Sequence, residues 1–315
     1  MRMKYVLEAL VVLVVASIQM EQSGRALGKT LGNLNIMGIG GSTSGFAPHI
    51  IGGYNAQIKD YPFVCYLEYR SYFICTCTIM RPRKVLTAAH CLTHIRHQSQ
   101  LRYLNVIVGL ENVQNKEEEL ASGLARRYTV KTIKNHPNYT VNPSDNAIHV
   151  NDIAGIELTK QINSKQFNGR VKPMWKLAKE KDYTDSVECY IFGYGATGLE
   201  VEEQNGEQYT TLTFPTQLQE ANVPIQSRSV CEDEYGVSLR KSQICAFENE
   251  GGVAACSGDS GGPLACKHGN IWRLLGICSY GYEDCSFGTV YTDARYFRTW
   301  LNAQPNGDDD FRIRC

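Results

Sequence analysis

A serine set among glycines is the stretch of this sequence whose residue types point most directly to chemistry. Ser260 lies in GDSGG, residues 258–262. A serine hydroxyl attacks a carbonyl group only when a base removes its proton and donors stabilise the oxyanion that forms. The glycines allow the amides of Gly258 and Ser260 to point at one spot, as an oxyanion site requires. Taken alone, such a run is equally compatible with a turn, so the hypothesis needs partner residues.

Two residues far away in the sequence are candidates for those partners. His90, in LTAAHCL, has the ordinary pKa of a group that can accept a proton at neutral pH and return it. Asp152, in NDIAGIEL, lies at the edge of an apolar run, where burial would hold its carboxylate against the other imidazole nitrogen. The chain order His, Asp, Ser is one of the known orders of a hydrolytic triad.

The elements that must position these residues are predicted to be short strands. Runs such as FVCYLEY, YFICTCTIM, RYLNVIVGL and LLGICSY are rich in β-branched and aromatic residues and are separated by turn residues. This spacing predicts an all-β barrel or sandwich. A helix is predicted over 293–303, DARYFRTWLNA, with Asp293 as its cap. The last residues, 304–315, have the composition of a solvated tail.

Charge and cysteine content restrict the class of protein. The 315-residue chain has 32 Lys and Arg against 32 Asp and Glu, so no electrostatic attraction to nucleic acid or to a membrane surface is expected. Its 12 cysteines are spread singly, which favours disulfides over zinc ligation and therefore an oxidising compartment. No metal ion or other cofactor is expected.

The beginning of the chain has the layout of a secretory signal. Arg2 and Lys4 precede an apolar run from Val6 to about Ile18, which is too short to span a bilayer. A signal anchor is the alternative. We expect a signal peptide over 1–19, followed over 20–49 by a flexible, cysteine-free segment rich in glycine and serine.

Four motifs in order, IIGGY, TAAHC, DIA and GDSGGP, resemble those of the chymotrypsin/trypsin family of serine proteases. The resemblance runs from Ile50 to about Asn302. It implies two six-stranded antiparallel β-barrels, a C-terminal helix and an active site in the cleft between the barrels. His90 and Asp152 would come from the first barrel and Ser260 from the second. Ser260 would attack the carbonyl, with His90 as general base and then acid and Asp152 holding its tautomer.

The resemblance also implies activation by cleavage. In this family a new amino group, here that of Ile50, inserts and pairs with the acid before the catalytic serine, here Asp259. The residue before the cleaved bond is His49, where trypsin-activated relatives have Arg or Lys. We therefore expect a zymogen, an activating protease of non-tryptic specificity, and a propeptide over 20–49 that is not tethered by a disulfide.

The same alignment places Ala254 and Ala255 at the floor of the primary specificity pocket, where trypsins have an acid. A lysine or arginine head buried there would lack a counter-charge, which costs several kcal/mol. Thr289 stands where a glycine usually leaves room, whereas Gly281 leaves the other wall open. We expect small to medium apolar side chains to be preferred, with aromatic ones second. The strand that binds substrate backbone would contain Ser279, Tyr280 and Gly281.

Disulfide pairing follows from the resemblance for eight cysteines. The implied pairs are Cys75–Cys91, Cys189–Cys266, Cys231–Cys245 and Cys256–Cys285. A further bridge between Cys65 and Cys77 is predicted because the two fall on successive strands with a register that could face them. For Cys278 a buried thiol is favoured, and Cys315 is left either free or paired between molecules.

Three weaker features concern loops. Asn138-Tyr139-Thr140 is an acceptor for N-glycosylation. The stretch LENVQNKEEEL lies where some relatives bind calcium, but Leu110 replaces a carboxylate ligand, so a solvated acidic loop is predicted instead. Glu283 or Asp284, on the pocket rim, could alternatively reach inward and restore a preference for basic side chains.

Together these features predict a secreted serine endopeptidase with its protease domain over 50–303. Its expected partners are protein or peptide substrates, an activating protease and protease inhibitors. The rival hypothesis is a non-catalytic homologue that acts as a binding or regulatory cofactor in a proteolytic cascade. An intact triad favours the enzyme, and His49 is the feature that favours the rival.

Overall fold

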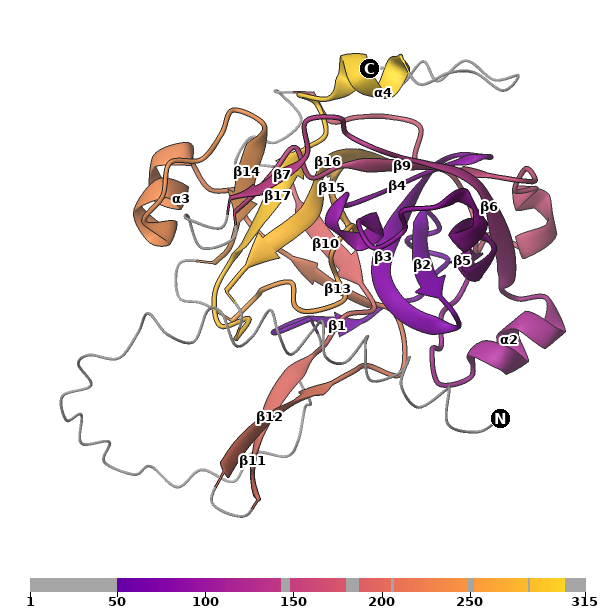
Figure 1. Cartoon of the computed structure of the whole chain (residues 1–315), viewed down its shortest axis with the longest axis horizontal. Coiled ribbons are helices and arrows are strands. Elements are labelled where there is room, and N and C mark those ends of the chain that lie inside the picture. The colour runs from indigo at the N-terminus through magenta and orange to yellow at the C-terminus, as the bar shows by residue number, and fades with distance from the viewer. Residues whose placement is uncertain are drawn as a thin grey trace. The chain divides into compact units, whose positions relative to one another are not determined.

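The computed structural model describes residues 50–142, 148–179, 187–204, 207–248, 252–282 and 284–303. The predicted signal peptide, the propeptide with His49, the tail with Cys315, and Glu283 lie outside these ranges. The described strands and helices are shown in Figure 1, and their bounds are as follows: β1 Tyr54–Asn55, β2 Val64–Tyr69, β3 Tyr72–Arg81, β4 Lys84–Thr87, η1 His90–Leu92, η2 Gln98–Tyr103, β5 Leu104–Val108, α2 Lys116–Ser122, β6 Arg126–Asn135, β7 Thr140–Asn142, β8 Ile148–Val150, β9 Ala154–Leu158, η3 Ser164–Phe167, β10 Cys189–Gly193, β11 Gly198–Gln204, β12 Glu207–Thr213, β13 Gln219–Asn222, α3 Arg228–Tyr235, β14 Gln243–Ala246, β15 Pro263–His268, β16 Ile271–Gly281, β17 Thr289–Asp293 and α4 Arg298–Asn302.

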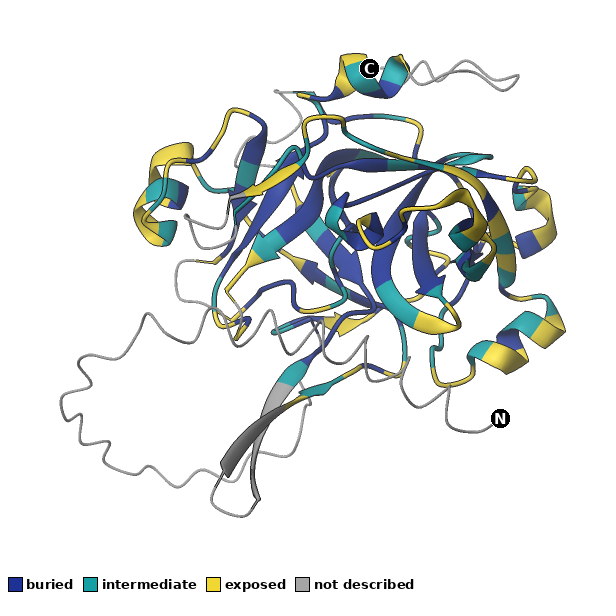
Figure 2. Ribbon diagram, viewed as in Figure 1, coloured by how far each residue is buried: buried dark blue, intermediate teal, exposed yellow. Residues whose placement is uncertain are grey.

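The first half of the fold is a closed six-stranded antiparallel barrel. Its strands follow one another in the order β2-β3-β4-β9-β6-β5. The alternating apolar residues of β9, Ala154, Ile156 and Leu158, are buried, and the two residues between them are partly exposed. Figure 2 shows the barrel strands largely in the colour of buried residues. The barrel therefore forms because one face of each strand supplies the core that its neighbours cover.

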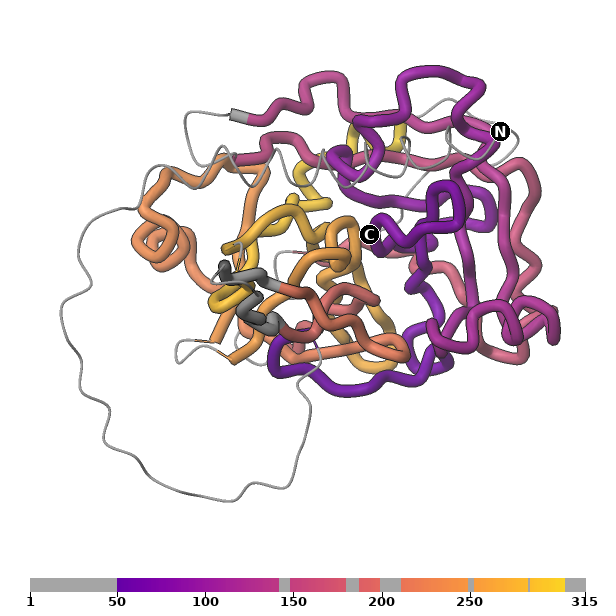
Figure 3. The backbone as a smooth tube through the Cα atoms, turned by 60° about the horizontal axis from the view of Figure 1, so that its bottom comes forward, coloured from indigo at the N-terminus to yellow at the C-terminus, as the bar shows by residue number. Residues whose placement is uncertain are grey.

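The second half is an antiparallel sheet of seven strands rather than a six-stranded closed ladder. Its order is β1-β13-β10-β15-β16-β17-β14. A bridge between Ile225 and Ala246 links the β14 edge to the segment that follows β13, so the sheet curls back on itself. The expectation of two six-stranded barrels is therefore confirmed for one of them only: in the described residues one barrel is closed, and the other half is a curled sheet of seven strands. Figure 3 shows the first described residues, in indigo, running past the strands of this sheet.

Five disulfides stabilise the part of the fold that the structure describes. The four pairs that the family resemblance implied are present, and Cys65–Cys77 is a fifth. Cys65 and Cys77 are directly opposite each other in the ladder between β2 and β3, with their Cα atoms 4.8 Å apart. Cys278 has a buried free thiol. The disulfides fit the oxidising compartment that the cysteine count predicted.

The C-terminal helix is present but shorter than predicted. It begins at Arg298, and Asp293 is the last residue of β17 rather than the helix cap. The Asp293 carboxylate instead accepts hydrogen bonds from the backbone and guanidinium of Arg295. The strand continues to Asp293 because β17 is paired on both sides, with β14 and with β16. None of the helices in the described ranges has the length and apolar character that a bilayer crossing requires.

The acidic loop near residue 110 is not wholly solvated, so this prediction was wrong for one of its residues. Glu119 in α2 is 8% exposed, and its carboxylate accepts from the backbone amides of Glu111 and Asn112. Arg170 donates to the same carboxylate at 2.7 Å and also to the carbonyl of Gly109. The positive charge that closes this loop is therefore the guanidinium group of Arg170, a residue of the chain itself.

Removing that cation is expected to destabilise the protein strongly. Arg170→Met would leave the Glu119 carboxylate buried and unpaired, which costs about 3–5 kcal/mol. Urea unfolding with the disulfides intact measures the change. Lys131→Met is the control. Lys131 is 52% exposed and forms an ion pair with Glu157 at 3.1 Å, and exposed pairs of this kind contribute about 0–1 kcal/mol to stability. Equal losses in the two variants would contradict the assignment.

Candidate active site

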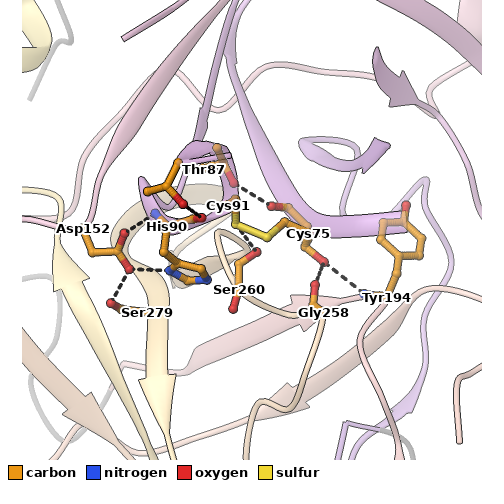
Figure 4. The surroundings of a disulfide bond; sticks show 11 residues. Cys75, Thr87, His90, Cys91, Asp152, Tyr194, Gly258, Ser260 and Ser279 are labelled. Atoms are coloured by element: carbon orange, nitrogen blue, oxygen red, sulfur yellow. Dashed lines mark hydrogen bonds and ion pairs between the residues drawn. A yellow bond between two sulfur atoms is a disulfide. The ribbon is translucent and has the colours of Figure 1, made fainter. Parts of the chain in front are cut away.

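His90, Asp152 and Ser260 are brought to one place from three separated segments. His90 begins η1, separated from the end of β4 by two alanines, and Asp152 precedes β9. The Nδ1 atom of His90 lies 2.7 Å from Oδ2 of Asp152, and the backbone amide of His90 donates to Oδ1 at 2.9 Å. Figure 4 shows Ser260 beside the imidazole, on the side away from Asp152. This is the arrangement that a nucleophile, a base and an orienting carboxylate require.

Asp152 is held by the second sheet as well as by His90. The hydroxyl of Ser279 donates to its Oδ2 at 2.6 Å, and the hydroxyl of Thr292 donates to its backbone carbonyl at 2.8 Å. Asp152 is 0% exposed. Ser279 was predicted only as part of a substrate-binding strand, and its bond to the carboxylate could not be read from sequence. A buried carboxylate with these donors has little freedom to move, so it fixes the ring that it contacts.

The charges of His90 and Asp152 stabilise each other. Burial opposes protonation of His90, but the negative charge and hydrogen bond of Asp152 outweigh it, so the pKa of His90 is raised above its usual value. Burial would raise the pKa of Asp152, but the charge of His90 and its hydrogen bond, helped by Ser279, hold this pKa below its usual value. The carboxylate is therefore ionised at neutral pH and stabilises a protonated imidazole.

The backbone of the GDSGG stretch has two amides without an internal acceptor. Gly258 has φ of 101°, and its carbonyl accepts from both the amide and the hydroxyl of Thr76. Within the described ranges, neither the Gly258 nor the Ser260 amide donates a hydrogen bond. Two such free donors on one turn can stabilise an oxyanion.

Only glycine fits at position 258. A Cβ atom there would lie 2.6 Å from the Phe73 ring and 2.9 Å from the Cα atom of Gly195. Phe73 and Thr76, both on β3, therefore shape the candidate oxyanion site from the first barrel. Neither residue was predicted from sequence, because nothing in YFICTCTIM marks a contact 182 residues away.

Asp259 is a buried carboxylate next to the candidate nucleophile. It is 1% exposed and accepts from the amides of Gly195 and Cys256 at 2.8 and 2.9 Å. Burial raises its pKa to about 7 despite these two bonds. Among the described residues no cationic side chain pairs with it. Ile50 is fully buried, and the next residue, Ile51, bridges to Ala254.

The residues predicted to line the specificity pocket gather on β16, β17 and the segment before Cys256. Ala254 and Ala255 are 3% and 8% exposed. The hydroxyl of Thr289 accepts from the amide of Ala255 at 3.0 Å. Gly281 is the ladder partner of Thr289, and a Cβ on Gly281 would lie 3.8 Å from the threonine hydroxyl. Thr289 therefore lies beside both Ala255 and Gly281.

Asp284, which could alternatively have reached into the pocket, forms hydrogen bonds with a residue close to it in the sequence. The Asp284 carboxylate accepts from both the amide and the hydroxyl of Ser286, and the residue is exposed. These bonds favour a rim position over an inward one. Asn138 is also exposed, immediately before the β7 and β8 hairpin.

His149, in β8, is another residue beside the candidate site that was not predicted from the sequence. Its ring centroid is 4.9 Å from that of His90, and one of its nitrogens lies 2.9 Å from the hydroxyl of Tyr139. Burial, together with the charge of His90, lowers the pKa of His149 to about 4 even though Asp152 acts in the opposite direction. The signal in the sequence was a histidine three residues before Asp152, but its position depends on how the hairpin folds back.

Comparisons with known proteins agree with this geometry. The family model described as Trypsin matches residues 50–301. A chymotrypsin-like serine proteinase of Haliotis rufescens is 30% identical over 269 residues, which cover 82% of this chain and 92% of that protein. The atrial natriuretic peptide-converting enzyme of Mus musculus is 30% identical over 261 residues, 81% of this chain but only 21% of that protein.

Among solved structures, neuropsin, a serine protease expressed in the limbic system of mouse brain, superposes with a TM-score of 0.60. It is 29% identical and the match covers 79% of this chain and 96% of that one. The chain therefore belongs to the chymotrypsin/trypsin-like family of serine proteases. Membership supports a hydrolytic function acting on protein or peptide substrates.

Proposed function

We propose that this protein is a serine endopeptidase that uses Ser260 as nucleophile, His90 as general base and then acid, and Asp152 as the orienting carboxylate. The observation that carries the proposal is the 2.7 Å contact between His90 and Asp152 with Ser260 on the other side of the ring. The raised pKa of His90 suits it to hold the proton taken from Ser260 until the leaving amine needs it. The amides of Gly258 and Ser260 would then stabilise the oxyanion.

The proposed enzyme is made as a zymogen. Asp259 is buried without a described cationic partner, so a new amino group at Ile50 would supply the missing charge. Because His49 is not basic, the activating protease would have non-tryptic specificity. The same proposal includes secretion, a signal peptide over 1–19, a protease domain over 50–303 and a glycan on the exposed Asn138.

For the residue before the cleaved bond, we propose a preference for small to medium apolar side chains. A floor formed by Ala254 and Ala255 would offer no counter-charge to a lysine or arginine, and Thr289, which is buried and accepts from the amide of Ala255, would shorten the pocket. Apolar pockets discriminate by only about 1–3 kcal/mol per methylene, so the preference would be broad.

A peptide-library cleavage profile tests both the activity and this preference. The full chain carries an engineered activation site at residue 49 that frees Ile50, and the profile is compared with that of Thr289→Gly. We expect the parent to cleave after small or medium apolar residues. Thr289→Gly should raise the ratio of kcat/KM for phenylalanine over alanine by about 10–200-fold, since it removes the side chain that fills the pocket.

Thr289→Val is the matched control, because it keeps the bulk of the side chain and loses only the hydroxyl. Its preference should remain that of the parent. A preference for lysine or arginine in the parent would refute the pocket assignment while leaving the mechanism standing. No serine-dependent cleavage from a verified Ile50 terminus would instead favour the non-catalytic homologue.

A further inference from the structure

The β7–β8 hairpin lies outside the barrel and the seven-stranded sheet, yet it places a side chain beside the candidate base. In the described residues β7 and β8 pair only with each other. The ring centroid of His149 in β8 is 4.9 Å from that of His90 and 6.1 Å from that of Tyr280 in β16. The hairpin and β16 therefore flank the candidate base, and their separation decides how a substrate can lie next to it.

Gln243, in β14, connects these two elements through its side chain. Its Nε2 atom donates to the backbone carbonyl of His149 at 3.0 Å and to the hydroxyl of Tyr280 at 3.1 Å. Its Oε1 atom accepts from the backbone amide of Arg240 at 2.7 Å. A carboxamide nitrogen has two hydrogens to donate, and the amide of Arg240 requires an acceptor on its side, so these three partners fix the orientation of the carboxamide.

Gln243 is itself held close to the candidate triad. It is 3% exposed, and its ladder partner in β17 is Thr292, whose hydroxyl donates to the backbone carbonyl of Asp152. Burial of a long polar side chain costs rotamer entropy, and the three hydrogen bonds of the Gln243 carboxamide offset this cost. The position of β14 is therefore fixed relative to Asp152, and Gln243 extends this fixed geometry to the hairpin and to Tyr280.

We propose that Gln243 is a positioning residue that holds the β7–β8 hairpin and Tyr280 at the separation that an extended substrate requires. Gln243 touches neither the substrate nor the reacting atoms and acts through His149 and Tyr280. A substrate with several residues before the cleaved bond contacts these two side chains, whereas a substrate with one residue there does not. Gln243 therefore affects KM for extended peptides rather than the rate of the chemical step. This inference rests on the proposed function, because it concerns the substrate of the same site.

Hydrolysis of a long and a short substrate by the full chain, cleaved to free Ile50, tests this role. Both substrates are acetylated 4-nitroanilides, one with three alanines followed by the residue that the library profile prefers, the other with that residue alone. In Gln243→Met, KM for the long substrate should rise about 10-fold with kcat unchanged, which corresponds to about 1.4 kcal/mol and is within the range of a lost hydrogen bond. The short substrate should keep the parent's kcat/KM. An equal change for both substrates would overturn the proposal.

The control and a second variant are compared by the ratio of kcat/KM for the long substrate over the short one. Gln219→Met is the matched control, because Gln219 is another buried glutamine, its Nε2 atom donates to the side chain of Asn55, and four strands separate β13 from β14 in the sheet order. It should keep the parent's ratio. Tyr280→Phe keeps the ring and loses one acceptor of Gln243, so it should lower the ratio by about 2–10-fold. Adding it to Gln243→Met should cause no further loss, because the same bond is already absent, and an additive loss would contradict the link.

Peptide binding tests the same role without hydrolysis. The probe is fluorescein-labelled tetra-alanine amide, and its Kd for the cleaved Ser260→Ala protein is measured by fluorescence anisotropy. Adding Gln243→Met should raise this Kd by about 10-fold, for the same reason that it raises KM. Equal affinity with and without Gln243→Met would overturn the proposal. A parent that hydrolyses neither substrate, combined with an affinity that still depends on Gln243, would contradict only the proposed function.

Discussion

Replacing Ser260 with alanine is expected to lower kcat by about 10⁶-fold in protein cleaved to free Ile50. Loss of the nucleophile removes the covalent route altogether, and the residual rate comes from the oxyanion amides and substrate binding alone. His90 and Asp152 keep their 2.7 Å contact without the serine hydroxyl, because the backbone of His90 and the side chain of Ser279 also hold the carboxylate. The effect is measured by hydrolysis of the best library peptide and by labelling with a fluorophosphonate probe.

Ser257→Ala is the matched control for this substitution. Ser257 lies on the same loop three residues earlier, and its side chain is exposed. It should keep the parent's kcat and its labelling by the probe. If Ser260→Ala retained more than about one hundredth of the parent's activity, another nucleophile would have to be sought. Labelling of the uncleaved parent as strong as that of the cleaved parent would leave the nucleophile intact but contradict the zymogen.

Freeing the amino group of Ile50 is expected to raise activity by about 10²- to 4 × 10³-fold. The Asp259 carboxylate is buried, its pKa is raised to about 7, and no described side chain neutralises it. A buried ion pair that lacks one partner costs about 3–5 kcal/mol, which corresponds to that factor at about 1.4 kcal/mol per tenfold change. The measurement compares the same protein before and after cleavage at the engineered site.

Asp259→Asn in the cleaved protein should lose activity by a similar factor, because the amide is neutral and cannot pair with the ammonium group. The pH profile gives a second measurement. A free terminal amine has a pKa of about 7.7–8.0, and a neighbouring carboxylate raises it. The protonated amine is the active form, so activity should persist below the raised pKa and fall as the pH rises through it. A profile that stays flat well above that range, or full activity of Asp259→Asn, would refute the insertion.

The candidate nucleophile, base and carboxylate and the class of protein could be predicted from the sequence alone. The types and order of His90, Asp152 and Ser260, together with the family resemblance, predicted that these three side chains meet at one site, because a serine nucleophile needs a base and a carboxylate. Strand-rich composition predicted the mainly β fold, and family resemblance implied four of the five disulfide pairs that the structure contains. Local patterns carry this information because side-chain chemistry and β propensity belong to single residues or short runs.

The contacts that each residue makes could be read only from the three-dimensional structure. The bond from Ser279 to Asp152 spans 127 residues, and the contact of Thr76 with the Gly258 carbonyl spans 182. Packing between distant elements likewise determines the burial of Glu119 against Arg170 and the end of β17 at Asp293. It also determines the placement of His149 against His90. No local pattern encodes such contacts, because burial and hydrogen bonding between strands arise only when the barrel and the sheet have formed around a shared core.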